Sequence, residues 1–265
     1  MFNSVNRSML PLFSGGLDLN IPYNIPNLNM SLESQYITSP NGAAHFAGNY
    51  FDGTNTIGAI YGSNFYVNSF TYNGYMSAKL SNVNSPVLAP SGIWSFGNLL
   101  NTYTYCVAYN NLQNTNTEEN LLLNTRDGLI TGPNIFVKIY RPFGADYLKI
   151  ELTDSTTNQI IITTIETTQG LNILILNYDD TTKILNVYIN GTLYTGTNLL
   201  MSGHFWDKNG NAQTANVYMS NGGVNNFWVG WLCDQYIYNR ILSNAEINIL
   251  GNFLAKKFAG NWTNI

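Results

Sequence analysis

The acidic residues of the chain are the first candidates for chemistry, because cleavage of a glycosidic bond needs two carboxyl groups that face each other across that bond. Glu151 and Asp154 lie in one strand-like segment. They are three positions apart, so their side chains point to opposite faces of a strand. This pair does not meet across one substrate, and we expect no catalytic residues and no enzymatic activity.

The residues that could act as nucleophiles or bases are scattered. His45 and His204 have no serine or cysteine in a recognisable nucleophile setting, and neither Cys106 nor Cys233 has a basic neighbour in sequence. Both cysteines lie in apolar, strand-like segments, which favours buried free thiols over a disulfide. We therefore interpret the histidines and cysteines as structural residues.

One loop combines aromatic, acidic and amide side chains. Trp206 lies between His204 and Asp207, and Asn209 follows in a segment rich in Gly and Asn. An exposed indole offers a flat surface on which the apolar face of a pyranose stacks. The alternating oxygen donors do not form an EF-hand, because the glycine comes too early and Tyr218 stands where the closing Glu belongs. We take Trp206, His204, Asp207 and Asn209 as the candidate ligand-binding residues, with a plain Asn-Gly turn as the alternative.

Charged residues are few. They make up 10% of the 265 residues, with 11 Lys plus Arg against 15 Asp plus Glu and a net charge of −4. Nucleic-acid binding needs clustered cations, and the longest basic run is Lys256-Lys257. The first residues are not followed by an unbroken apolar run. We therefore expect no nucleic-acid partner, no signal peptide and no membrane insertion.

The residues after about position 43 form short runs rich in Tyr, Val, Ile, Thr and Phe, separated by Gly, Asn and Asp, which is typical of strands. The clearest hairpin joins residues 171–178 to residues 183–189, and Asn190-Gly191 then provides a tight turn. No long helix interrupts these runs, so the sheets are expected to be antiparallel. Further strands are predicted at residues 59–61, 64–72, 102–109, 135–140, 147–152, 159–164 and 227–238.

The first 41 residues have a different character. They contain Pro11, Pro22, Pro26 and Pro40 and show neither a period of 2 nor one of 3.6. This predicts an extended N-terminal arm over 1–41, followed by one domain over 42–265. The apolar arm residues expected to make assembly contacts are Phe2, Leu10, Leu12 and Phe13.

One short helix is predicted near the C-terminus. Ser243 and Glu246 have the spacing of a capping box, in which each side chain satisfies an amide at the helix start. Lys256 and Lys257 complement the negative end of the helix dipole, and Gly260 suits its end. A buried apolar stripe is formed by Ile247, Leu250, Leu254 and Phe258.

The C-terminal run of residues 227–247 contains Tyr238-Asn239-Arg240, Leu242-Ser243 and Glu246-Ile247. It resembles the ending of the laminin-G-like jelly rolls in the concanavalin A-like lectin and glucanase superfamily. The hairpin with Tyr178-Asp179 and Asn190-Gly191, and the weaker Phe51-Asp52-Gly53, are similar to two further motifs of that family. The resemblance covers about residues 42–258. It implies an all-β, antiparallel two-sheet jelly-roll sandwich, concanavalin A-like, with one short C-terminal helix and an extended N-terminal arm.

The resemblance also implies which ligands to consider. Laminin-G-like domains often hold a calcium ion at a loop rim, for which Asp179 and Asp180 are the candidates here; no other cofactor is expected. The hydrolases of the superfamily carry an E-x-D-x-x-E pattern on one strand, which this chain lacks. Other members of the superfamily are carbohydrate binders, adhesion modules and virion or tail-fibre proteins.

Two functions follow as hypotheses. The first is a structural virion protein, capsid-associated or a fibre subunit, of a large DNA virus or phage. Such a protein would be assembled in the host cytoplasm and would contact other capsid proteins or copies of itself. The alternative is a carbohydrate-binding or adhesion module that recognises a host surface glycan.

Overall fold

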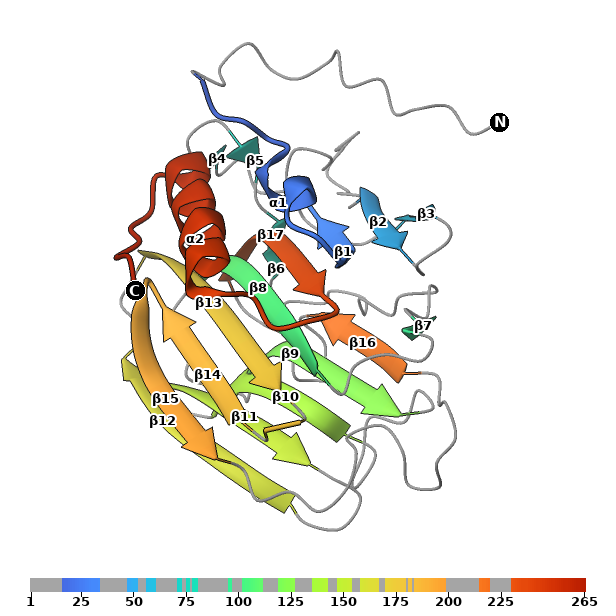
Figure 1. Ribbon diagram of the computed structural model, residues 1–265, viewed down its shortest axis with the longest axis vertical. Coiled ribbons are helices and arrows are strands. Elements are labelled where there is room, and N and C mark those ends of the chain that lie inside the picture. Colours follow the sequence, from blue (N-terminus) through green and yellow to red (C-terminus); the bar gives the residue numbers. More distant parts are fainter. Residues whose placement is uncertain are drawn as a thin grey trace.

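Figure 1 shows the computed structural model of the protein, whose described residues form mainly strands, with one helical turn near the N-terminus and a helix near the C-terminus. No helix among the residues that it describes is long and apolar enough to span a membrane. The described residues are 16–33, 47–51, 56–60, 71–72, 75–76, 78–80, 95–96, 102–111, 119–126, 135–142, 147–153, 158–166, 170–179, 181–182, 184–198, 215–219 and 230–265.

The larger sheet has nine strands, and all of its pairs are antiparallel. Three long central strands correspond to the predicted segments 102–109, 171–178 and 227–238, of which residues 227–229 lie outside the described residues. In spatial order the strands are β15 (Thr192–Asn198), β14 (Ile184–Ile189), β13 (Gly170–Asp179), β8 (Thr102–Asn111), β17 (Gly230–Tyr238), β1 (Leu28–Leu32), β2 (Ala47–Phe51) and β3 (Thr56–Ile60), with β6 (Ala78–Leu80) also paired to β17.

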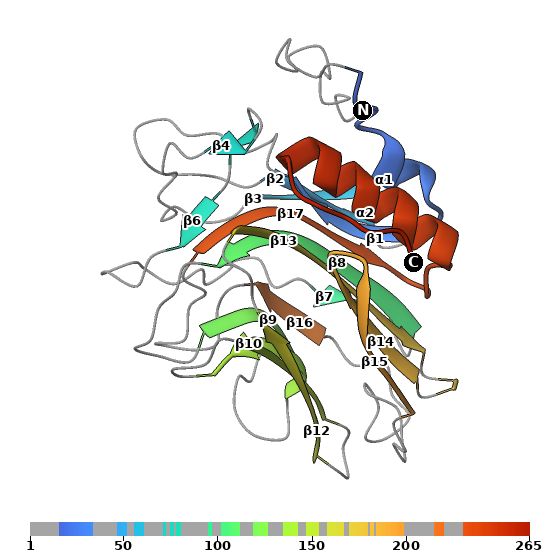
Figure 2. The same ribbon diagram turned by 90° about the vertical axis from the view of Figure 1, so that its left-hand side faces the viewer.

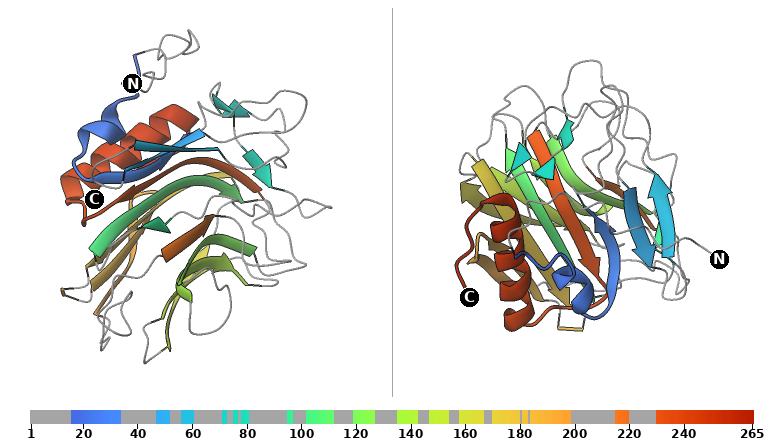
Figure 3. Two further views of the ribbon diagram at one scale, coloured as in Figure 1. Left: turned by 90° about the vertical axis from the view of Figure 1, so that its right-hand side faces the viewer. Right: turned by 90° about the horizontal axis from the view of Figure 1, so that it is seen from above.

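The smaller sheet has six strands and lies against one face of the larger one, as the side views in Figures 2 and 3 show. Its order is β12 (Asn158–Glu166), β11 (Tyr147–Thr153), β10 (Ile135–Arg141), β9 (Glu119–Arg126), β16 (Ala215–Met219) and β7 (Ser95–Phe96). A separate pair is formed by β4 (Thr71–Tyr72) and β5 (Tyr75–Met76). The prediction of an all-β, antiparallel two-sheet sandwich with one short C-terminal helix is confirmed.

The predicted hairpin forms as expected. Strands β13 and β14 pair from Leu174–Ile189 to Asp179–Ile184. Asn190 and Gly191 have φ values of 51° and 86°, which is the conformation that a tight turn to β15 requires. Leu185 and Val187 are buried and Asn186 between them is less buried, as the period-2 pattern predicts. The prediction of a half-buried strand is wrong, because Tyr188 on the face of Asn186 is also buried, in the cluster under the C-terminal helix.

Helix α2 (Asn244–Phe258) lies on the outer face of the large sheet, opposite the small sheet (Figure 2). The capping box between Ser243 and Glu246 is present. All four residues of the predicted stripe are buried and pack against Cys106, Ile173 and Tyr238 of the sheet, among others. The helix ends with Ala259 in the left-handed conformation (φ 54°), one residue before the predicted Gly260. Both cysteines are free and buried, as predicted.

Part of the expected N-terminal arm belongs to the sandwich. A helical turn, α1 (Ile21–Asn24), is followed by β1, which pairs with β17 on one side and with β2 on the other. The prediction that residues 28–32 belong to an extended arm is wrong. The alternation typical of a strand is not visible there, because β1 has only five residues and its register shifts between Leu28 and Met30. The arm residues Phe2, Leu10, Leu12 and Phe13 lie outside the described residues.

Strand β17 contains a bulge that sequence alternation did not predict. Its register against β8 shifts between Leu232 and Gln235. As a result Cys233 packs in the same cluster as Tyr236 and Tyr238 under the helix, whereas strict alternation placed it on the face of Ile237. Asp234 lies on the helix side as well, where alternation with Tyr236 places it, and it contacts Lys257.

Candidate functional site

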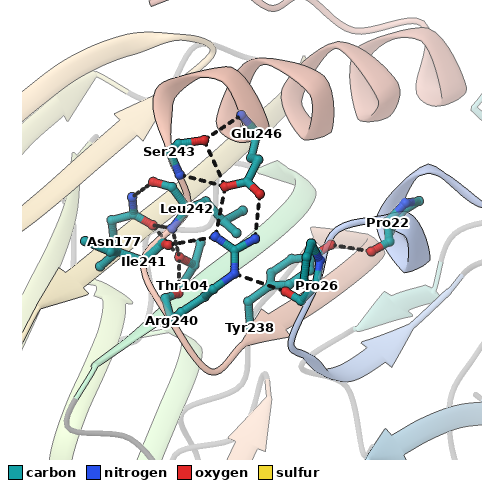
Figure 4. A network of polar contacts seen from close by, with 10 residues as sticks. All are labelled: Pro22, Pro26, Thr104, Asn177, Tyr238, Arg240, Ile241, Leu242, Ser243 and Glu246. Atoms are coloured by element: carbon teal, nitrogen blue, oxygen red, sulfur yellow. Dashed lines mark hydrogen bonds and ion pairs between the residues drawn. The ribbon is translucent and has the colours of Figure 1, made fainter.

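The residues of the family-like C-terminal motif form a polar network at the start of helix α2 (Figure 4). The guanidinium of Arg240 donates to Glu246 through both terminal nitrogens, at 2.6 and 2.9 Å, and its Nε donates to the carbonyl of Pro26 at 3.1 Å. The hydrogen bonds from Arg240, together with those from Ser243, lower the pKa of Glu246 to about 2. One side chain therefore ties the helix start to the segment between α1 and β1.

The same network reaches the two central strands. Thr104 on β8 donates to the carbonyl of Arg240 at 2.8 Å, and Asn177 on β13 donates to the carbonyl of Leu242 at 2.9 Å. The amide of Leu242 donates back to Thr104 Oγ1 at 3.0 Å, and all three side chains are buried. These bonds satisfy polar backbone that the fold buries. The motif that carries the resemblance is thus part of the architecture of the sandwich.

Asp179, one of the two calcium candidates, has a structural role in the hairpin turn. Its carboxylate accepts hydrogen bonds from the amide of Thr181 at 2.9 Å and from the hydroxyls of Thr182 at 2.8 Å and Thr102 at 3.4 Å. Partial burial raises the pKa of Asp179, but these hydrogen bonds outweigh it and leave that pKa lowered. Asp180 lies outside the described residues, among which no group of three His, Cys, Asp or Glu could hold a metal. Calcium binding stays a prediction.

The predicted ligand-binding loop cannot be compared with the fold. Trp206, His204, Asp207 and Asn209 all lie outside the described residues. The described part of the chain instead contains two groups of side chains that sequence analysis did not single out. One is a buried acidic cluster beneath helix α2, and the other is a set of tyrosines and an arginine at one end of the sandwich.

The buried acidic cluster consists of Glu33, Asp234, Tyr236, Tyr23 and Lys257. The hydroxyl of Tyr236 lies 2.8 Å from Glu33 Oε1 and 2.7 Å from Asp234 Oδ2. Tyr23 on α1 donates to Glu33 Oε2 at 2.9 Å, and Lys257 Nζ on α2 lies 2.5 Å from Asp234 Oδ2. The cluster therefore joins α1, the end of β1, β17 and α2 through side chains alone.

Burial dominates the electrostatics of this cluster. Glu33, Asp234 and Lys257 are each at most 1% exposed. Burial and the neighbouring Asp234 raise the pKa of Glu33 to about 7, against the opposing effects of Lys257 and the two tyrosines. The sequence analysis assigned Lys257 only to the negative end of the helix dipole and did not predict its burial against Asp234. Its position four residues after Phe253 was the available signal, because that spacing places it on the buried face of the helix.

Tyrosines line the face of the large sheet that looks toward the small sheet. Tyr105 donates to Gln235 Oε1 at 2.9 Å, and the rings of Tyr103 and Tyr178 lie 6.1 Å apart. The hydroxyl of Tyr103 is buried and has no hydrogen-bond partner within the part of the chain that the structure describes. Burial raises the pKa of Tyr103 well above its usual value. This face is an aromatic core with its polar atoms largely enclosed.

Tyr109 is influenced by two residues from other strands, Arg141 and Tyr194. Tyr109 lies near the end of β8, opposite Asn172 at the start of β13. Burial and the nearby Tyr194 raise the pKa of Tyr109, and Arg141 of the small sheet lowers it. Tyr109 and Arg141 are buried, whereas Tyr194 is 42% exposed.

Tyr194 sits at an irregularity in the edge strand β15. The register pairs Val187 with Thr195 and Tyr188 with Leu193, so Tyr194 is the extra residue of a β-bulge. Bulges redirect a side chain and occur next to functional sites more often than elsewhere. Tyr194 therefore presents a half-exposed aromatic ring on the edge strand of the large sheet.

Comparison with known proteins places the fold. No family model and no curated protein matches the sequence. Among solved structures, the fold is similar to Trypanosoma rangeli sialidase in complex with the inhibitor DANA, with a TM-score of 0.54 and 14% identity over 88% of this chain and 34% of the sialidase. It is also similar to the receptor-binding domain of botulinum neurotoxin type G, with a TM-score of 0.51 and 13% identity over 87% of this chain and 51% of that one.

A weaker similarity concerns the IT-sialidase CBM40 of Ruminococcus gnavus bound to alpha2,6 sialyllactose. Its TM-score is 0.45, with 18% identity over 58% of this chain and 84% of that one. The chain spans about a third of the Trypanosoma sialidase and about half of the neurotoxin structure. At such identities the likeness concerns the fold alone. The fold is a β-sandwich of the jelly-roll-like kind found in lectin domains.

Proposed function

We propose that the protein is a carbohydrate-binding module that recognises a glycan at the start of strand β15. The observation that carries this proposal is the half-exposed ring of Tyr194, which a bulge presents on the edge strand β15 and which acts electrostatically on the buried Tyr109. An aromatic ring that is rigidly presented on an edge strand offers an apolar surface to one face of a sugar ring and a hydroxyl to its substituents.

The buried neighbours support this presentation of Tyr194. Arg141 and Tyr109 are 2% and 0% exposed, so they do not stack on a ligand themselves. The side chain of Asn172 accepts from Asn190 Nδ2 at 3.0 Å, which fixes the adjoining turn. A site on such a framework keeps its geometry before the ligand arrives, which reduces the entropy cost of binding.

Two further observations support binding of a glycan. The chain has few charges, so recognition through stacking and neutral hydrogen bonds suits its composition. The fold is shared with a domain that is named for receptor binding and with part of a sialidase. These similarities raise the expectation of a glycan ligand, and the site itself has to carry the argument.

We also propose that the module binds without catalysing a reaction. The two carboxyl groups that lie close together in the described structure are Glu33 and Asp234. They are 1% and 0% exposed and lie on the helix side of the large sheet, so a glycosidic bond does not reach them. Glycosidase chemistry would need such a pair on an open surface.

The test is a glycan array probed with the labelled protein and three variants. Tyr194→Ala is expected to weaken binding about fivefold, because it removes an aromatic contact of about 1 kcal/mol. Tyr194→Phe keeps the ring and is expected to retain most of the binding. Ile249→Ala changes a residue of helix α2 that is 48% exposed and serves as the control. No binding to any glycan, or equal binding by the Tyr194→Ala variant, would contradict the proposal.

The structural role in a virion stays a prediction from the sequence. It depends on the arm residues before position 16, which lie outside the described part of the chain. The strand β1, which had been assigned to the arm, is a member of the sheet.

A further inference from the structure

The hydroxyl of Tyr236 has one proton but touches two carboxyl groups. Its oxygen lies within hydrogen-bond distance of both Glu33 Oε1 and Asp234 Oδ2. A phenol donates one hydrogen bond and accepts others, so only one of the two contacts can use its proton. The second contact needs a proton from the other side, which means that one carboxyl group carries a proton.

The partners of the two carboxyl groups identify which one is protonated. Asp234 lies 2.5 Å from the ammonium of Lys257, which compensates a negative charge there. Glu33 accepts from the neutral hydroxyl of Tyr23 at Oε2, so a proton on Oε1 completes its hydrogen bonding. The donors then run in one direction, from Tyr23 to Glu33, from Glu33 to Tyr236 and from Tyr236 to Asp234.

This arrangement neutralises the cluster with a single cation. The groups that face Glu33 come from each element packed around it, and Lys257 is the one cation among the described residues of the cluster. The groups around Glu33 are Tyr23 on α1, Ser31 on β1, Asp234, Tyr236 and Tyr238 on β17, and Lys257 on α2. An ionised Glu33 would add a second negative charge at a site that is 1% exposed.

We propose that Glu33 is a proton-dependent latch, whose protonated carboxyl holds strand β1 and helix α1 against β17 and α2, and whose ionisation loosens them. Glu33 directly follows the last residue of β1, and the contacts of its side chain reach α1 and β17. Loosening at this point weakens the pairing of β1 with β17.

The direction of the pH dependence follows from linkage. The pKa of Glu33 is raised from 4.5 to about 7 when the segment is docked. Protonation therefore favours docking, and this contribution is fully present below pH 4.5 and lost as the pH rises to 7. Within that window the ratio of docked to loosened molecules is expected to fall by up to about tenfold for each pH unit.

Native-state amide hydrogen exchange between pH 4.5 and 8 tests the latch. The exchange rates of the β1 amides are divided by those of an unstructured peptide at each pH, which gives their protection. In the wild type, the protection of residues 28–32 is expected to fall strongly up to about pH 7 and then to level off. The protection of the central strand β13 is expected to change much less.

Two variants separate the latch from general effects of pH. Glu33→Gln imitates the protonated acid, because its amide donates and its carbonyl accepts, so the protection of β1 should no longer depend on pH in this window. Glu246→Gln changes a carboxylate whose pKa is about 2 and should keep the wild-type dependence. If the wild-type protection of β1 is equal at pH 5 and pH 7, or if Glu33→Gln keeps the fall, the latch is wrong.

Discussion

Lys257 Nζ lies 2.5 Å from Oδ2 of Asp234, and both side chains are completely buried. The ammonium also lies over the rings of Phe253 and Phe258, at 5.6 and 5.3 Å from their centroids. This ion pair fixes helix α2 on the bulge of β17, the strand at the centre of the large sheet. Helix and sheet are thus joined by a buried charge pair as well as by apolar packing.

Removing one member of this pair leaves the other charge buried. Lys257→Met is therefore expected to lower the free energy of unfolding by about 3 to 5 kcal/mol. The matched control is Lys256→Met, which changes the exposed neighbour and should alter stability by less than about 0.5 kcal/mol. Urea unfolding followed by circular dichroism measures both. Equal effects of the two variants would show that the pair does not hold the helix.

Gly191 combines a positive φ with a close approach of the C-terminal tail. A Cβ at this position would lie 1.7 Å from the carbonyl oxygen of Thr263. Gly191→Ala is expected to destabilise the protein by clearly more than the roughly 1 kcal/mol of left-handed backbone strain. Gly16→Ala is the control, because Gly16 has a φ of 72° and open space around it. Thermal unfolding of both variants decides the comparison, and a smaller loss at Gly191 than at Gly16 would contradict the tail contact.

The two thiols are expected to be inert in the folded protein. Cys106 and Cys233 are buried and free. Burial and the nearby Asp234 raise the pKa of both thiols, so little reactive thiolate forms at neutral pH. A thiol reagent such as Ellman's reagent should react with both cysteines in urea and with neither at a comparable rate in buffer. Rapid modification of the native protein would show that the core beneath helix α2 is open.

The carboxylate of Glu246 should stabilise the protein in a pH-dependent way. Its pKa falls from 4.5 to about 2 through the hydrogen bonds from Arg240. A lowered pKa gives a contribution that is present above pH 4.5 and is lost as the pH falls toward 2. Glu246→Gln is therefore expected to cost about 1 to 2 kcal/mol at pH 7 and less at pH 3, as measured by urea unfolding. A cost that is the same at both pH values would contradict this.

Local features of the fold were predictable from the sequence because their signals are local. The Asn190-Gly191 turn and the cap at Ser243 each satisfy a backbone requirement within a few residues. Strand β1 was missed because its five residues carry no clear alternation, and its pairing partner β17 lies about 200 residues later in the chain. Such a strand is defined by its partner and not by its own residues.

The candidate sites depended even more on tertiary structure. Nothing near Glu33 in the sequence indicates that Asp234 and Lys257 will surround it, because the pairing of β1 with β17 and the packing of a helix face bring them there. Tyr194 is one tyrosine among 18, and the bulge that exposes it appears only in the register with β14. The predicted ligand loop around Trp206 lies outside the described residues.

The central claim is that a glycan binds over Tyr194, and mapping of NMR chemical shifts tests it most directly. The ligand is the strongest glycan from the array, titrated into isotope-labelled protein. The largest shift changes are expected at residues 192–194 and at the adjoining turn of Asn190 and Gly191, with little change in helix α2. Changes that are concentrated elsewhere, with Tyr194 unaffected at saturation, would contradict the claim.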